Sequence, residues 1–169
     1  MDTATDKDNF LLLIQANKGI IIKICNTYCK NKLDQEDLAQ EIIYHLWKSS
    51  KSFNPDYKFS TWMYRVALNI AISFYRKEKK ATPLLPLNEW HINIEVPQLA
   101  NDETEKNIQL LQLFISQLKE LDKALILLSF ESKSYKEISE ILGISETNVA
   151  TRISRIKERL KQQFANHQK

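Results

Sequence analysis

Hydrophobic residues recur at helical spacing along most of the chain, and the clearest pattern lies in residues 60–80. Trp62, Val66, Ile70 and Phe74 recur every four positions, with Met63, Ala67 and Ala71 beside them, which predicts the buried stripe of an amphipathic helix. A second stripe on another face of this helix is polar and comprises Thr61, Arg65, Asn69, Ser73, Arg76 and Lys80. The helix therefore has one face for a core and one face with donors for phosphates and base edges.

Two tyrosines and a basic run accompany the polar stripe. Tyr64 and Tyr75 flank it and are expected to lean outward, and the segment Arg76–Lys80 carries four basic residues at the end of the helix. Single-stranded nucleic acid offers both phosphates and unstacked bases, and a face with cations and aromatic rings suits both. The pattern therefore predicts binding of single-stranded nucleic acid.

Periodic patterns and capping residues predict helices in the rest of the chain. Asp34 is a suitable N-cap residue with Asp37 at the N3 position. Ser134 and Glu137 match a capping box, and Gly143 suits the end of the helix that follows. The segments with helical patterns are residues 8–30, 34–48, 103–119, 121–132, 134–143 and 145–164. Because only 2 of the 169 residues are glycine, the predicted fold class is all-α.

Charge is unevenly distributed along the chain. Residues 1–80 hold 13 Lys/Arg against 9 Asp/Glu, and residues 133–169 hold 8 against 4. By contrast, residues 81–105 hold no Lys/Arg and 5 Asp/Glu, and prolines interrupt this stretch. We therefore predict two small helical domains, residues 1–80 and 104–169, joined by a flexible acidic linker over residues 81–103.

The C-terminal pattern SYKEISEILGISETNVATRISRIKERL has the form of a helix-turn-helix. Its second helix is expected to turn the polar residues of its N-terminal half outward, namely Glu146, Thr147, Asn148, Thr151, Arg152 and Arg155. Asn pairs with adenine and Arg with guanine or phosphate, so this face predicts binding of duplex DNA. The alternative is an ordinary helical hairpin with a solvated polar face.

Other functional classes find little support in the sequence. The N-terminus lacks the pattern of a signal peptide and no apolar run is long enough to cross a bilayer, so we expect a cytoplasmic protein. Cys25 and Cys29 lack the further ligands that a zinc site needs and are interpreted as small buried hydrophobes. No phosphate-binding glycine loop, metal-binding carboxylate cluster or Ser/His/Asp set is present, so we expect no cofactor and no enzymatic activity.

Two segments in the N-terminal half resemble conserved region 2 of bacterial sigma factors. They are DQEDLAQEIIYHLWKS and FNPDYKFSTWMYRVALNIAISFYRKEKK, and the C-terminal helix-turn-helix looks like region 4 of the same family. The short intervening linker is similar to that of the extracytoplasmic-function (ECF) group. The resemblance implies a promoter-specificity subunit that binds core RNA polymerase and promoter DNA, and an anti-sigma factor as a further partner. The alternative is a stand-alone helix-turn-helix regulator that binds duplex operator DNA.

The resemblance also implies roles for individual residues. Those expected to bind core polymerase are Asp34, Asp37, Gln40 and Glu41. Those expected to hold the −10 element are Phe53, Asn54, Lys58, Arg65, Asn69, Arg76 and Lys77. Those expected to read the −35 element are Thr147, Asn148, Thr151, Arg152 and Arg155. Two departures from the family pattern, Ile72-Ser73-Phe74 and Ala150, bear on which promoter sequence is read.

Overall fold

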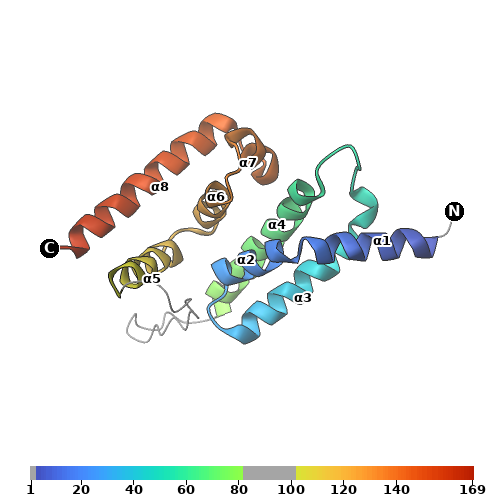
Figure 1. Cartoon of the computed structure of the whole chain (residues 1–169), viewed down its shortest axis with the longest axis horizontal. Coiled ribbons are helices and arrows are strands. Elements are labelled where there is room, and N and C mark those ends of the chain that lie inside the picture. The colour runs from blue at the N-terminus through green and yellow to red at the C-terminus, as the bar shows by residue number, and fades with distance from the viewer. Residues whose placement is uncertain (1–2, 82–101) are drawn as a thin grey trace.

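The computed structural model describes residues 3–81 and 102–169, which form two helical units (Figure 1). The N-terminal unit contains α1 (Thr3–Ala16), α2 (Lys18–Tyr28), α3 (Lys32–Lys48), the short 3-10 helix η1 (Ser50–Ser52) and α4 (Phe59–Ala81). The C-terminal unit contains α5 (Asp102–Ser116), α6 (Glu120–Phe130), α7 (Tyr135–Leu142) and α8 (Glu146–His167). The all-α prediction is confirmed over these residues. The predicted linker, apart from its ends, lies outside them.

The N-terminal unit is a bundle of α2, α3 and α4 with α1 against one end. Its core includes Ile24 of α2, Leu38 and Ile42 of α3, and Leu68 of α4, all buried. The single helix predicted over residues 8–30 is wrong, because the chain bends by 53° between α1 and α2. The bend brings Phe10 of α1 against the rings of α3 and α4, where burial of a large aromatic side chain offsets the loss of a continuous helix.

In the described part of the chain, no single helix has both the length and the apolar character needed to cross a membrane, although α1 and α2 taken together as a bent pair meet that test.

The helix α3 begins earlier than the sequence pattern indicated. Asn31 is its N-cap, and the Asn31 side chain accepts a hydrogen bond from the backbone N–H of Asp34 at 2.8 Å. The prediction of Asp34 as the N-cap is therefore wrong by three residues. Asp34 lies in the first turn instead, where its carboxylate favours the positive end of the helix dipole.

The buried stripe of α4 is partly as predicted. Met63, Ala67 and Ala71, which were expected beside the row of larger residues, are buried together with Tyr64 and Leu68. The predicted row of Trp62, Val66, Ile70 and Phe74 packs beside this core and is only partly buried. The inward side of the helix is therefore displaced by about one residue, or about 100°, from that row.

The helix-turn-helix is confirmed in its local details. Ser134 and Glu137 form a capping box at the start of α7, and Gly143 ends that helix in the left-handed region at φ 67°. Ser145 caps α8 by accepting from the N–H of Asn148. The inward-facing residues Ile138 and Ile141 of α7 are buried and Leu142 is partly buried, and the buried row of α8 comprises Val149, Ile153, Ile156 and Leu160. The helix α8 continues to His167, where Phe164 packs edge-on against Phe114 of α5.

The two units touch along one side of each. The helices α6 and α7 lie against α4, and α6 also lies against α2 (Figure 1). The helices α5 and α8 lie on the far side of α6, so the N-terminal turns of α8 remain at the molecular surface. The contact between the units is therefore made by α6 and α7, the two middle helices of the C-terminal unit.

Candidate nucleic-acid interface

The N-terminal turns of α8 present the residues expected to read duplex DNA. Thr147, Asn148, Thr151 and Arg155 are all exposed on the side of α8 away from its buried row. The Ser145 cap and the left-handed turn at Gly143 fix the direction in which this helix leaves α7. Local backbone geometry thus places four polar side chains on one protruding face.

Arg152 lies differently from its neighbours. Its side chain is only 32% exposed, and its Nε lies 3.4 Å from Oδ1 of Asp122 in α6. The guanidinium is therefore held by an acidic side chain of the same unit. Arg155 and Arg159, three and seven residues further along α8, are exposed and keep this side of the helix basic.

The polar face of α4 is open along most of its length. Arg65, Asn69 and Ser73 are exposed, as the sequence pattern predicted, whereas Thr61 of the same predicted stripe is partly buried. Lys77 of the basic run is also exposed, four residues after Ser73. Arg76 is also exposed, but its Nε lies 2.9 Å from Oε1 of Glu120 in α6. The face therefore offers a cation, an amide and a hydroxyl in succession, while one of its arginines already has a carboxylate partner.

The loop before α4 places its three candidate residues in different surroundings. Phe53 is partly buried, with its ring 5.2 Å from that of Phe59 and 5.5 Å from that of Trp62. Asn54 is exposed and its Oδ1 accepts the backbone N–H of Asp56 at 3.0 Å, which stabilises the turn. Lys58 is exposed, and its Nζ lies 3.8 Å from Oε1 of Glu137 in α7.

The two tyrosines of α4 do not lean outward, so that expectation is wrong. Tyr64 is 2% exposed, and burial together with the nearby Glu131 raises its pKa to about 12. Tyr75 is partly buried, with its ring 6.1 Å from that of Tyr28 and 4.2 Å from Nζ of Lys123. Both rings are used in the contact with the C-terminal unit, where packing outweighs solvation of the hydroxyl.

The outer face of α3 is acidic and partly apolar. Asp37 and Gln40 are exposed, whereas Asp34 and Glu41 are partly buried at its margin. Exposed hydrophobic side chains continue the same face, namely Leu33, Ile43 and Tyr44. A surface with carboxylates and unpaired apolar groups has the composition of a protein-binding face rather than of a nucleic-acid-binding one.

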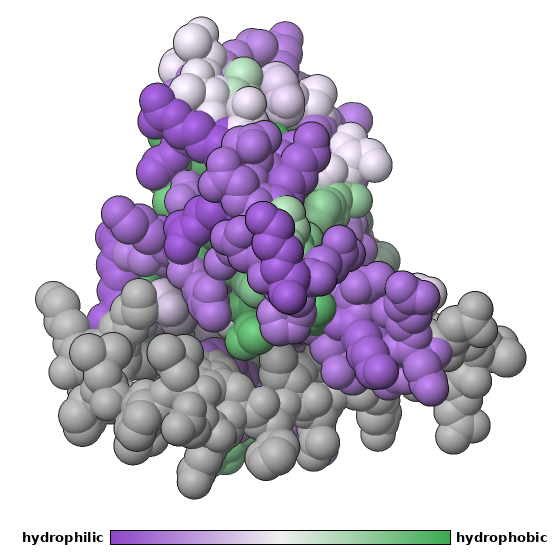
Figure 2. All heavy atoms as spheres, turned by 90° about the vertical axis from the view of Figure 1, so that its left-hand side faces the viewer, coloured by the Kyte–Doolittle hydropathy of each residue, from purple (hydrophilic) through white to green (hydrophobic). Residues whose placement is uncertain are grey.

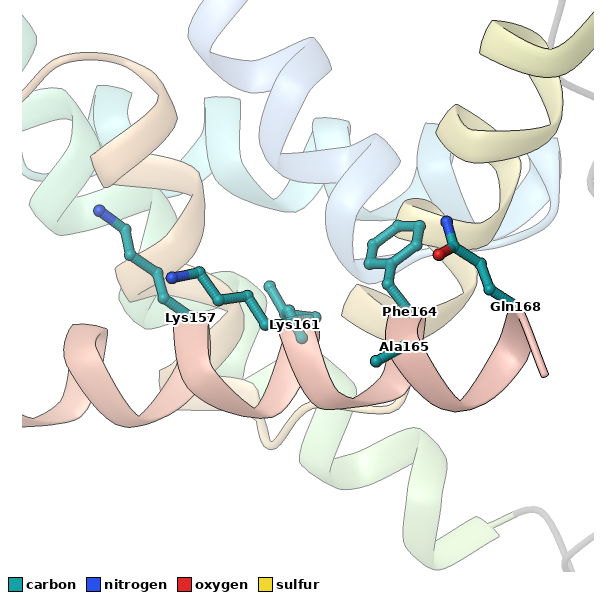
Figure 3. A pocket seen from close by; sticks show the side chains of 6 residues that line it. Lys157, Lys161, Phe164, Ala165 and Gln168 are labelled. Atoms are coloured by element: carbon teal, nitrogen blue, oxygen red, sulfur yellow. The ribbon is translucent and has the colours of Figure 1, made fainter.

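An open groove of about 470 Å³ runs along the last turns of α8. Lys157, Lys161, Phe164 and Gln168 point to the same side there (Figure 3). At about 100° per residue, Lys157 lies on the opposite side of the helix from Asn148, so the groove is separate from the polar face of the N-terminal turns of α8. Seen from the side of α5 and α8, the surface is mostly hydrophilic and hydrophobic groups show between polar ones (Figure 2).

Comparison with known protein families identifies the family to which this chain belongs. The Sigma-70 region 2 family matches residues 13–81, and the Sigma-70 region 4 family matches residues 108–160. The ECF RNA polymerase sigma factor SigW of Bacillus subtilis is 30% identical, over 94% of this chain and 90% of that protein. The chain belongs to the ECF group of sigma-70 factors. The ECF sigma-E factor of Haemophilus influenzae is 26% identical over 90% of this chain and 86% of its own length.

Solved structures of other proteins share the fold of this sigma factor. A structure of CnrH in complex with the cytosolic domain of CnrY has a TM-score of 0.67 at 17% identity, covering 96% of this chain and 94% of that one. A structure of RpoE with the anti-sigma factor NepR from Bartonella quintana has a TM-score of 0.63 at 19% identity, covering 94% and 96%. Both units of the sigma factor are matched in each case.

Family membership identifies this chain as a promoter-specificity subunit of RNA polymerase. Such subunits recognise promoters and are not themselves the catalysts of transcription. No finding favours the stand-alone helix-turn-helix regulator. The interpretation of Cys25 and Cys29 as buried hydrophobes is confirmed, because both side chains are buried, and burial raises the pKa of Cys25 to about 11.

The sequence pattern missed the residues that join the two units, namely Tyr28, Glu120, Lys123 and Glu131. These residues join positions that lie 44 to 108 residues apart in the chain, and a local sequence pattern carries no information about such distant contacts. One signal was available: Lys123 stands within the apolar run LDKALILLSF, at a position that a helical pattern turns toward a core. A charged residue at such a position indicates a polar or aromatic partner.

Proposed function

We propose that the sigma factor binds core polymerase, the −10 element and the −35 element with three separate surfaces. The outer face of α3 binds core RNA polymerase, the loop before α4 and the polar face of α4 hold the opened −10 element, and the N-terminal turns of α8 read the −35 duplex. The corresponding domains are residues 1–80 and 104–169, with the acidic linker over 81–103. The observation that carries the proposal is the pair of open polar faces on separate helical units, one on α4 and one on α8.

The α8 face suits the major groove. Asn148 lies in the first turn of a capped helix, with Thr147 and Thr151 beside it and Arg155 one turn further on. Asn is able to make two hydrogen bonds to adenine and Arg two to guanine, each good pair being worth about 1–3 kcal/mol of discrimination. Arg152 joins this set when it leaves Asp122 for a base edge or a phosphate.

The α4 face suits an opened strand. Asn69 offers both a donor and an acceptor for a base edge, Arg65 lies one turn before it, and Lys77 supplies charge for the phosphates. Unpairing a base costs a few kcal/mol, and stacking on an aromatic ring returns about 1–3 kcal/mol per base. Phe53 is partly buried against Phe59 and Trp62. The capture of bases therefore depends on Asn54, Arg65 and Asn69 more than on stacking.

The α3 face suits a basic partner with apolar side chains of its own. Asp37 and Gln40 provide acceptors for its charged groups, and Leu33 and Tyr44 provide apolar contact area. We assign this face to core polymerase in the cytoplasm. An anti-sigma factor is the further partner that we propose, supported by the neighbouring RpoE structure, which contains the anti-sigma factor NepR.

The test is run-off transcription from a pool of genomic promoter fragments with purified core polymerase. The proposal expects start-site-specific transcripts only when the sigma factor is added. Asp37→Lys is expected to lower transcript yield at limiting sigma factor, because it reverses a charge on the docking face, whereas the matched change Asp8→Lys on α1 is expected to have little effect. Equal transcription with and without the sigma factor, from an active core, would refute the proposal.

A further inference from the structure

The polar face of α8 continues past the residues proposed to read the −35 element. Its arginines are Arg152, Arg155 and Arg159, and only Arg159 lies outside the proposed reading set. At about 100° per residue, all three lie within about 40° of Asn148 around the helix axis. The buried row of α8 keeps its steps of three and four residues past this point, so the helix stays regular and the four side chains form one stripe. With a rise of about 1.5 Å per residue, the stripe runs about 16 Å from Asn148 to Arg159.

The last two arginines of this stripe lack an acidic partner. Oδ1 of Asp122 lies 3.4 Å from Nε of Arg152, whereas neither Arg155 nor Arg159 makes an ion pair within residues 3–81 and 102–169. Glu158 lies on the flank of the stripe, and its Oε1 accepts a hydrogen bond from Gln162 at 3.5 Å instead. Arg155 and Arg159 are four residues apart, a spacing at which like charges destabilise a helix. A bound anion would relieve this repulsion.

The packing of α5 leaves Arg159 exposed. The helix α5 covers the buried side of this part of α8, where Phe164 packs edge-on against Phe114. Beside that contact, Nε2 of Gln163 lies 3.3 Å from Oε1 of Gln117. Arg159 lies about 90° around the helix from the centre of the buried row, and α8 lies at one edge of the molecule (Figure 1). Its guanidinium therefore projects beside the packed surface and on the same side as Asn148.

A backbone phosphate of duplex DNA is the ligand that suits this position. The N-terminal residues of a recognition helix contact base edges in the major groove. Arg159 lies about three turns beyond Asn148, so it lies nearer to the sugar–phosphate backbone that borders the groove than to the bases. A guanidinium matches a phosphate with two parallel N–H donors, and the pair is a strong, charge-assisted one.

We propose that Arg159 binds a backbone phosphate beside the −35 base pairs and anchors α8 on the duplex without reading its sequence. The inference rests on the proposed function of α8 in −35 recognition. Phosphate contacts fix the position and orientation of a protein on DNA, whereas base contacts determine which sequence is bound. Arg159 is therefore a positioning residue, and its loss should weaken binding to different promoter sequences by the same factor.

The first test measures the salt dependence of promoter binding. Polymerase reconstituted with the sigma factor is titrated onto a duplex promoter that run-off transcription has recovered. Each phosphate contact adds about 0.9 to the slope of log affinity against log salt concentration. Arg159→Gln should therefore reduce this slope by about 0.9, which corresponds to about eightfold weaker binding at about 0.1 M salt if the two lines meet near 1 M. An unchanged slope would overturn the phosphate contact.

Two further variants control for charge and for folding. Lys157→Gln removes one positive charge two residues away on the opposite side of α8, where Lys157 points toward the groove (Figure 3), and it should leave the slope unchanged. Arg159→Lys keeps the charge and should keep the slope, because a lysine also binds phosphate as a point charge. Equal losses of slope from Lys157→Gln and Arg159→Gln would show a general charge effect and no contact at Arg159.

The second test locates the phosphate. A neutral methylphosphonate replaces one phosphate at a time across the −35 element and the base pairs that flank it. At one position the replacement should weaken binding of the wild type several-fold and leave binding of Arg159→Gln unchanged, which is the coupling of a double-mutant cycle. Absence of such coupling at every position would overturn the proposal.

The third test asks whether Arg159 reads sequence. The ratio of affinities for the recovered promoter and for the same duplex with a scrambled −35 element should be equal in the wild type and in Arg159→Gln. A lower ratio in Arg159→Gln would mean that the arginine contacts a base, which contradicts the proposal. Failure of run-off transcription refutes the proposed function instead, whereas an unchanged salt slope with transcription intact refutes the role of Arg159 alone.

Discussion

Arg152→Ala offers the sharpest test of the −35 surface, because the structure gives this residue two separable interactions. The arginine lies in the part of α8 that we propose to face DNA and pairs with Asp122 at 3.4 Å, with side chains 32% and 18% exposed. A bidentate contact to a base is worth about 1–3 kcal/mol, which corresponds to a five- to 150-fold loss of affinity. A partly exposed ion pair is worth at most about 1 kcal/mol of stability. The substitution should therefore impair DNA binding far more than folding.

The assay separates the two roles by a double-mutant cycle. Affinity of the reconstituted polymerase for a promoter recovered by run-off transcription is measured by fluorescence anisotropy, and stability of the sigma factor by urea unfolding. Asp122→Asn should lower stability by less than about 1 kcal/mol while leaving promoter affinity unchanged or higher, since it frees the guanidinium. Lys157→Ala on the opposite side of α8 is the control for loss of one charge. If Asp122→Asn weakened promoter binding as much as Arg152→Ala, the arginine would be structural and the reasoning refuted.

Three further predictions follow from individual side chains. Asn69→Ala should reduce open-complex formation, measured by permanganate reactivity, more than closed-complex affinity, because Asn69 lies on the exposed face assigned to the opened strand; equal losses would count against that assignment. The Ser134 N–H hydrogen bond lowers the pKa of Glu137, so the stabilisation is present at neutral pH and is lost as the pH falls through the lowered value. The stability difference from Glu137→Ala in urea unfolding should therefore begin to shrink as the pH falls below the ordinary pKa of 4.5 and should go on shrinking as the pH falls through the lowered pKa. Burial raises the pKa of Cys25 from 9.0 to about 11, which lowers its thiolate fraction about 100-fold; fast reaction of the native thiols with a disulfide reagent would show that α2 is open.

Sequence reasoning succeeded where local chemistry determines structure. The helix-turn-helix depends on a capping box at Ser134, a left-handed glycine at Gly143 and a cap at Ser145, all of which act within a few residues. The polar face of α4 was also predictable, because Arg65, Asn69 and Ser73 are exposed as their spacing indicates. In both cases the relevant interactions lie within one or two helical turns of the residues that determine them.

Sequence reasoning failed where contacts with distant segments determine the environment of a residue. Tyr64 looked suited to an outward position, but Glu131 and Lys133 at the end of α6 enclose it. The cap of α3 was misplaced because Asn31 and Asp34 are both good capping residues, and only the packing of the preceding turn selects the first. The pairing of Arg76 with Glu120 joins residues 44 positions apart, so no periodicity could have indicated that a candidate DNA contact is occupied.

The measurement that tests the central claim most directly is permanganate footprinting of one recovered promoter, with core polymerase alone, sigma factor alone and both together. The account predicts reactive thymines near the start site only when both proteins are present, because α4 holds the opened strand while polymerase keeps α4 and α8 in register. Protection of a duplex palindrome by the sigma factor alone, without any strand opening when core polymerase is added, would contradict it.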